Sequence, residues 1–108
     1  MDEFTVDEMQ EMQKMLQDKY KDKWEGISPE VGQNKLLWMV GEIGEVIDIV
    51  KKHGGFEASH NVDLRGQLVE ELADVLMYYN DVLLCYGISS KELKSAYIEK
   101  SRKNMKRW

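Results

Sequence analysis

Two pairs of acidic residues, Glu42-x-x-Glu45 and Glu71-x-x-Asp74, have the type and spacing that could do chemistry in this chain. A spacing of three places both members of a pair on one side of a helix, so two packed helices could bring four carboxylates to one point. Four carboxylates without a counter-ion would repel each other. A hard divalent cation that prefers oxygen ligands, Mg²⁺ above all, would stabilise such a cluster. The pairs therefore predict a cation site between two helices.

Helix start and stop signals predict the elements that position these acids. Thr5 followed by Glu8, and Ser89 followed by Glu92, have the capping-box pattern, and Ser28 stands before the only proline as a helix cap. The expected helices run from Thr5 to about Trp24, from Pro29 to about His53, from about Val62 to Tyr86, and from Ser89 into the C-terminus, with a loop over residues 54–61. The fold class is therefore all-α, a four-helix bundle.

Length and composition limit the classes of protein to which the chain can belong. Its 108 residues, 43% of them hydrophobic, predict one domain over residues 1–108. No segment is apolar for long enough to span a membrane, and the acidic N-terminus lacks the pattern of a signal peptide. The single cysteine, Cys85, agrees with a reducing cytoplasm, where we expect the protein to act. A net charge of −5 argues against a nucleic acid polymer as partner.

Helical-wheel positions set the acids beside apolar surface. The stripe expected to form the core face of the second helix consists of Leu36, Val40, Ile43, Ile47 and Val50. Glu42 lies roughly 120° from its centre, yet its neighbours there are Trp38, Met39, Val46 and Ile49. Glu71 and Asp74 lie at the margin of the apolar stripe of the third helix. Because an unpaired buried charge is costly, these acids need partners, and the alternatives to a cation are neighbouring Lys and Arg side chains or solvent.

The segment GEIGEVIDIVKK, followed by a loop and LVEELADVLMYYNDVLLCYGIS, resembles the MazG-like nucleoside triphosphate pyrophosphohydrolases, an all-α family. That family carries E-x-x-E on one helix and E-x-x-D on the next, and ELADVL is its most recognisable phrase. The resemblance covers about residues 30–108. The tail AYIEKSRKNMKRW is similar to the closing K…N…R segment of the family.

The resemblance implies Mg²⁺-dependent hydrolysis of a nucleoside triphosphate to the monophosphate and pyrophosphate, in control of the nucleotide pool, with Mn²⁺ as a substitute ion. The residues that carry over are the metal ligands Glu42, Glu45, Glu71 and Asp74 and the phosphate-binding residues Lys100, Asn104 and Arg107. Glu45 and Glu71 are the candidates for a catalytic base. A reactive phosphoanhydride chiefly needs charge neutralisation and an activated water, which such residues can supply.

Several alternatives stay open at this point. Trp38 could stack on a nucleobase, although a tryptophan at helical spacing is more often a core or interface residue. Lys100, Asn104 and Arg107 would, without the resemblance, be a solvated helix face near a favourable dipole end. A catalytically silent bundle that binds a nucleotide or a protein is the alternative function, and a cation-storage bundle is weakened by the lack of helical Glu-x-x-His pairs. The breadth of the apolar faces predicts a homo-oligomer, a dimer at least, and the family resemblance implies a homodimer or homotetramer.

Overall fold

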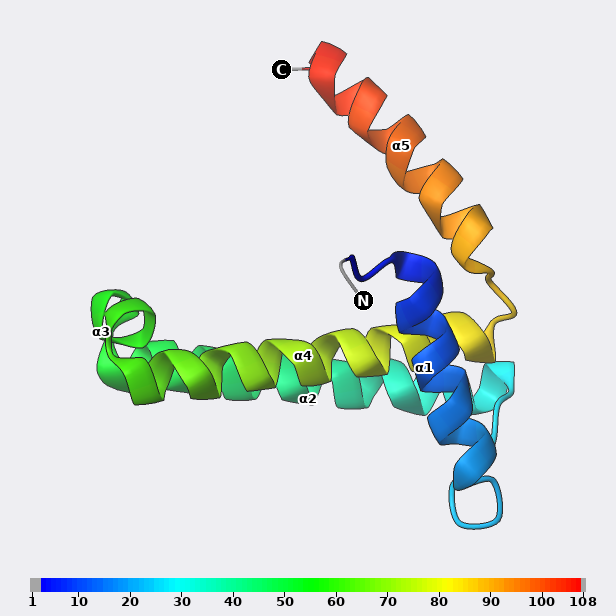
Figure 1. The fold of residues 1–108 in the computed structure, drawn as a ribbon, viewed down its shortest axis with the longest axis horizontal. Helices are drawn as coiled ribbons and strands as arrows, with labels where there is room; N and C mark the ends of the chain where they lie inside the picture. Colours follow the sequence, from blue (N-terminus) through cyan, green and yellow to red (C-terminus); the bar gives the residue numbers. More distant parts are fainter. Residues whose placement is uncertain (1–2, 108) are drawn as a thin grey trace.

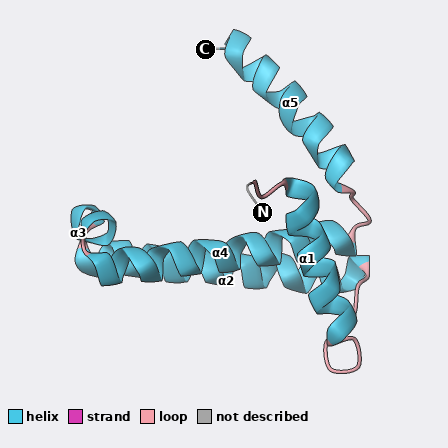
Figure 2. Cartoon of the chain, viewed as in Figure 1, coloured by secondary structure: helices cyan, strands magenta, loops and turns pink. Residues whose placement is uncertain are grey.

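The computed structural model describes residues 3–107 and confirms the all-α class (Figure 1). Only helices and the loops that join them occur in this part of the chain (Figure 2). The ends of the expected 1–108 domain, Trp108 among them, lie outside the described residues. The helices are α1 (Val6–Lys19), α2 (Pro29–His53), α3 (Gly55–His60), α4 (Val62–Cys85) and α5 (Ser90–Arg107). None of these is long and apolar enough to cross a bilayer.

The helix starts follow local capping chemistry, as the sequence predicts. The Thr5 hydroxyl accepts a hydrogen bond from the Glu8 amide at 3.1 Å, and the Glu8 carboxylate accepts one from the Thr5 amide at 3.1 Å. The Ser28 hydroxyl accepts from the Val31 amide at 3.2 Å, with Pro29 in the first turn. Each cap satisfies an amide that has no partner inside its helix. These starts are therefore fixed within a few residues of sequence.

The first helix is shorter than the sequence predicts, because α1 ends at Lys19 rather than near Trp24. The chain turns after Tyr20, where the Trp24 amide donates to the Tyr20 carbonyl at 2.8 Å. The Trp24 ring then stacks on the Tyr20 ring, with centroids 4.9 Å apart. The Trp24 ring also faces the Lys35 ammonium at 5.7 Å, a tertiary contact that favours the turn over a longer first helix.

The expected loop over residues 54–61 contains a further short helix, α3, so the described part of the chain has five helices rather than four. Gly54 makes the turn into it with φ of +85°, a backbone conformation that glycine tolerates best. Ala58 of α3 is 1% exposed, and the Phe56 and His60 rings stack with centroids 4.0 Å apart. Packing against the neighbouring helices therefore stabilises a six-residue helix that would not form alone.

The antiparallel pair of α2 and α4 forms the centre of the fold (Figure 1). Its seam repeats every three and four residues, with half-buried or buried positions on both helices. The α2 positions are Gly32, Lys35, Met39, Glu42, Val46 and Ile49, and the α4 positions are Leu64, Leu68, Glu71, Val75, Tyr78 and Val82. The stripe that the sequence predicts as the core face of α2 is wrong for a single chain, since Val40 and Ile47 are 62% and 55% exposed.

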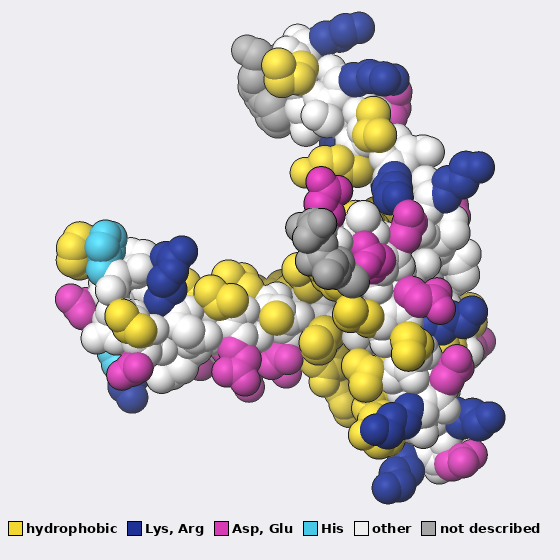
Figure 3. All heavy atoms as spheres, viewed as in Figure 1, with side chains coloured by type: hydrophobic (Ala, Val, Ile, Leu, Met, Phe, Trp, Pro, Cys, Tyr) yellow, Lys and Arg dark blue, Asp and Glu magenta, His cyan; other side chains and the backbone are white. Residues whose placement is uncertain are grey.

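The two remaining long helices lie at one end of this pair. α1 packs across α4, whereas α5 contacts α1 and no other described helix (Figure 1). Gln10 of α1 exchanges hydrogen bonds with the Ile88 carbonyl and the Ser90 amide, and Asp7 pairs with Lys94 at 2.7 Å. No residue of α5 is buried. The chain therefore leaves apolar surface open both on α5 and on the α2–α4 pair, where Figure 3 shows hydrophobic side chains at the surface.

Candidate active site

Glu42, Glu45 and Glu71 converge at the seam between α2 and α4. One carboxylate oxygen from each lies within 4.8 Å of those from the other two. Glu42 and Glu71 are half-buried and Glu45 is exposed. The convergence follows from the register of the seam, since Glu42 and Glu71 occupy seam positions and Glu45 follows Glu42 by three residues. The structure thus brings together three of the four acids that the sequence singles out.

Two oxygens of this cluster are buried without a hydrogen-bond partner among the described residues, Glu42 Oε2 and Glu71 Oε2. A hydrogen bond with Glu45, burial, and repulsion from the neighbouring acids raise the pKa of Glu71 to about 7. Burial and repulsion from Glu45 also raise the pKa of Glu42. Buried carboxylate oxygens are normally hydrogen-bonded or bound to a cation. The donor set therefore fits a hard divalent cation such as Mg²⁺.

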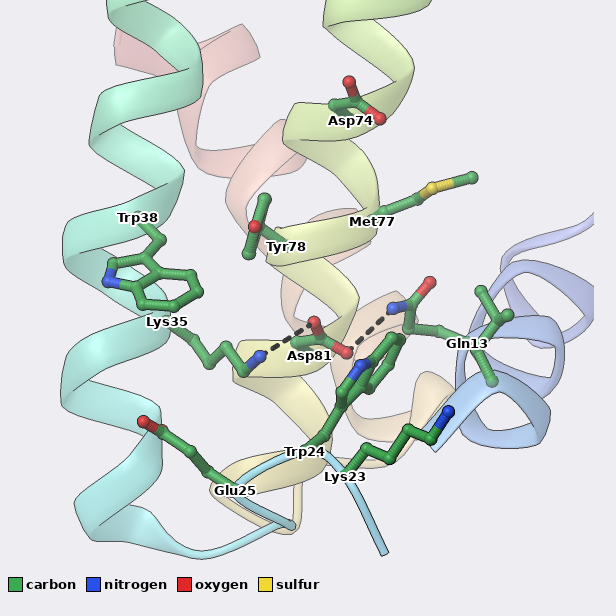
Figure 4. A pocket seen from close by; sticks show the side chains of 11 residues that line it. Gln13, Lys23, Trp24, Glu25, Lys35, Trp38, Asp74, Met77, Tyr78 and Asp81 are labelled. Carbon is green, nitrogen blue, oxygen red and sulfur yellow. Dashed lines mark hydrogen bonds and ion pairs between the residues drawn. The ribbon is translucent and has the colours of Figure 1, made fainter. Parts of the chain in front are cut away.

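A cavity of about 430 Å³ lies beside the cluster, between α1, the segment that follows it, α2 and α4 (Figure 4). Asp74 lines this cavity. Its charge also helps to raise the pKa values of Glu42 and Glu71, so it lies within electrostatic reach of both. Asp74 is therefore placed where the acidic cluster meets the cavity.

Aromatic rings and one lysine form a wall of the cavity. The Lys35 ammonium lies 5.7 Å, 5.6 Å and 5.8 Å from the ring centroids of Trp24, Trp38 and Tyr78. Trp38 is 54% exposed and meets the Tyr78 ring edge-on at 6.3 Å. Burial raises the pKa of Tyr78, and nearby carboxylates, led by Glu42, raise it further. The hydroxyl of Tyr78 therefore stays protonated and can donate a hydrogen bond. The wall therefore offers flat apolar faces beside hydrogen-bond donors, a surface suited to a flat heteroaromatic ring.

Asp81 joins three helices beneath this wall. It is 4% exposed, and its Oδ1 accepts hydrogen bonds of 2.8 Å from both Gln13 Nε2 and Gln17 Nε2 of α1. Its Oδ2 lies 3.8 Å from Lys35 Nζ of α2, so the buried carboxylate has a counter-charge (Figure 4). The network ties α1 to the α2–α4 pair and fixes the side chains around the cavity.

The predicted phosphate-binding residues lie elsewhere in the single chain. Lys100 and Arg107 are exposed and Asn104 is half-buried, all on α5. Because α5 contacts only α1 among the described helices, one chain does not bring these residues to Glu42, Glu45 and Glu71. Their role in phosphate binding stays a prediction.

The sequence reasoning missed several residues of the cavity wall. Lys35 lies three and seven residues before Trp38 and Glu42, and Asp81 lies seven residues after Asp74, so helical spacing could have found both. Gln13 and Trp24 carry no such signal, because they come from α1 and from the turn after it. Only tertiary packing places them at the cavity.

Comparison with known proteins adds one match. The family model of the MazG nucleotide pyrophosphohydrolase domain matches residues 30–106, which span α2 to α5. Comparisons with curated proteins and with solved structures gave no match. The matched residues contain both acidic pairs and leave α1 outside.

Proposed function

Since the chain belongs to the MazG nucleotide pyrophosphohydrolase domain family, we propose that it hydrolyses a nucleoside triphosphate to the monophosphate and pyrophosphate with Mg²⁺ as cofactor. Mn²⁺ would be a substitute ion, and the reaction would serve control of the nucleotide pool. The observation that carries the proposal is the convergence of Glu42, Glu45 and Glu71, with two buried oxygens that lack partners, beside a cavity.

The acids are proposed to bind the cation and to accept a proton from the attacking water. Glu42, Glu45 and Glu71 would hold the cation, with Asp74 beside them at the cavity. The cation, when bound, neutralises charge on the phosphates and makes the phosphorus easier to attack. Glu45 is the exposed member, so its carboxylate can take a proton from the attacking water.

The cavity is the candidate site for the nucleobase. Trp38 supplies an exposed indole to the cavity that Asp74 also lines, and Asp74 lies within electrostatic reach of the metal-binding acids. A base stacked on this ring would lie on the same side of α2 as Glu42, one turn away, so its phosphates could reach the acids. Trp38 is thus proposed to bind the base.

A second copy of the chain is proposed to complete the site. α5 has seven Lys and Arg residues against two Glu residues, and its apolar side chains Tyr97, Ile98 and Met105 are 74%, 53% and 82% exposed. The open face of α2 and the acidic cluster complement it in hydrophobicity and in charge. Packing of α5 on a partner chain would bring Lys100, Asn104 and Arg107 to the phosphates. The protein would then act as a homodimer or homotetramer.

A silent bundle that only binds a nucleotide is the competing function. The three clustered carboxylates, two of which have oxygens without a partner, argue against this function. Their mutual repulsion destabilises the fold, and without a bound cation nothing offsets that cost.

The test is incubation of the protein with a panel of ordinary and modified nucleoside triphosphates, with and without Mg²⁺. We expect monophosphate and pyrophosphate only when Mg²⁺ is present. Release of a diphosphate and orthophosphate would contradict the proposed position of cleavage, and binding without any turnover would support the silent bundle.

A further inference from the structure

We infer that Gln13 and Lys35, both held by Asp81, read the hydrogen-bonding edge of the nucleobase and make this protein selective among bases. The inference rests on the proposed function, and it adds the residues that choose the substrate. The ligand class is a nucleotide whose base presents both an N–H donor and a carbonyl or ring-nitrogen acceptor. Gln13 and Lys35 are assigned as specificity-determining residues and Asp81 as the positioning residue.

The orientation of Gln13 follows from Asp81. An ionised carboxylate only accepts hydrogen bonds, so Gln13 must turn its amino group to Asp81 Oδ1, which it contacts at 2.8 Å. The carbonyl oxygen of Gln13 is then directed away from Asp81, as Figure 4 shows, and no described residue donates a hydrogen bond to it. Gln13 is only 6% exposed and lines the cavity. The cavity wall therefore carries one fixed acceptor.

Lys35 supplies a donor to the wall of the same cavity. Its ammonium lies 3.8 Å from Asp81 Oδ2, on the other oxygen of the same carboxylate. Three aromatic rings surround the ammonium and hold it in place. One carboxylate thus holds Gln13, which carries an acceptor, on one oxygen and Lys35, a donor, on the other, and both side chains line the cavity. A nucleobase presents both donors and acceptors that such groups can bind.

Gln13 lies outside the part of the chain that matches the family model. α1 lies outside the residues that match the family model, whereas the acids that handle the metal lie inside them. Base reading would then depend in part on a helix outside the matched residues. The competing explanation is that the network around Asp81 only fastens α1 to the α2–α4 pair.

Substitution of Gln13 separates these explanations. Gln13→Met removes the acceptor at nearly constant volume, and Gln33→Met is the matched control, since Gln33 is an exposed glutamine on α2 away from the cavity. The readout is kcat/KM for four nucleoside triphosphates and for ribose 5-triphosphate, which has no base. We expect Gln13→Met to lower kcat/KM for the preferred base at least about tenfold, mainly through KM, and to leave the base-free substrate unchanged.

Two outcomes would overturn the inference. A parallel loss on all substrates, the base-free one included, would show a purely structural role, and unchanged ratios among the bases would show that Gln13 reads nothing. Lys35→Met, which removes the donor but leaves both glutamines on Asp81, gives the same test should Gln13→Met fail to fold.

A metal-free measurement separates this inference from the proposed function. Nucleoside monophosphates should quench tryptophan fluorescence through Trp24 and Trp38, with a preference among bases that Gln13→Met abolishes. That result supports base reading even if no triphosphate is hydrolysed. Hydrolysis together with binding that is equal for all bases would retain the function and overturn the inference.

Discussion

Asp81→Asn tests most directly how the cavity wall is held together. The change keeps the shape of the side chain but removes its charge. Asp81 accepts two hydrogen bonds of 2.8 Å and faces the Lys35 ammonium at 3.8 Å. An amide can still accept from the two glutamines, but its amino group would then face the ammonium, donor against donor.

The expected loss of stability is about 3 kcal/mol. Each hydrogen bond to a charged acceptor is worth about 1 kcal/mol more than one to a neutral acceptor. The ion pair adds about 1 kcal/mol, well below the value for a fully buried pair, since the Lys35 side chain retains 12% exposure and its aromatic contacts. Domains of this size have only about 5–15 kcal/mol in total.

Urea and thermal denaturation followed by circular dichroism measure this loss. We expect the melting temperature of Asp81→Asn to fall by about 12 °C. Asp63→Asn, at an exposed aspartate of the same helix, should stay within about 0.5 kcal/mol of the unchanged protein. The double variant with Lys35→Met should lose at least about 1 kcal/mol less stability than the sum of the losses of the two single variants, because the residues interact. A loss below about 0.5 kcal/mol for Asp81→Asn, or strict additivity, would refute the reasoning.

Three further predictions concern the acids and α5. Glu42→Gln and Glu71→Gln should stay folded and lose at least about a hundredfold in Mg²⁺-dependent kcat, whereas the exposed Asp48→Asn should not; full activity in both Gln variants would show that the site lies elsewhere. Because the pKa of Glu71 is raised from 4.5 to about 7, the folded metal-free protein retains a proton that the unfolded chain loses, so its stability should fall as pH rises through that window. Mg²⁺ should then raise the melting temperature more at about pH 7.5 than at about pH 5, and equal shifts would argue against Glu71 as a ligand. If α5 of one chain completes the site of another, mixing inactive Glu71→Gln with inactive Lys100→Ala should restore part of the activity after subunit exchange; a stable, active monomer in sedimentation would rule this out.

The local features of this protein are predictable from its sequence. Helix starts at Thr5, Ser28 and Ser89 depend on hydrogen bonds spanning three residues, so short patterns predict them. The acidic pairs are equally predictable, because residues three apart lie on the same side of a helix whatever that helix packs against.

Tertiary structure decided which face of α2 is buried and what surrounds the acids. A reading based on hydrophobicity placed the core at Val40 and Ile47, but the seam runs through Lys35 and Glu42. Hydrophobicity misplaces such a seam because its polar members are stabilised by partners on other helices, as Lys35 is by Asp81. Gln13 and Trp24 reach the cavity only through the packing of α1, and the separation of α5 from the acids depends on the whole arrangement. The spacing of two residues within one helix fixes the angle between their side chains around the helix axis. Which residues of different helices come into contact depends on long-range packing, which no local pattern contains.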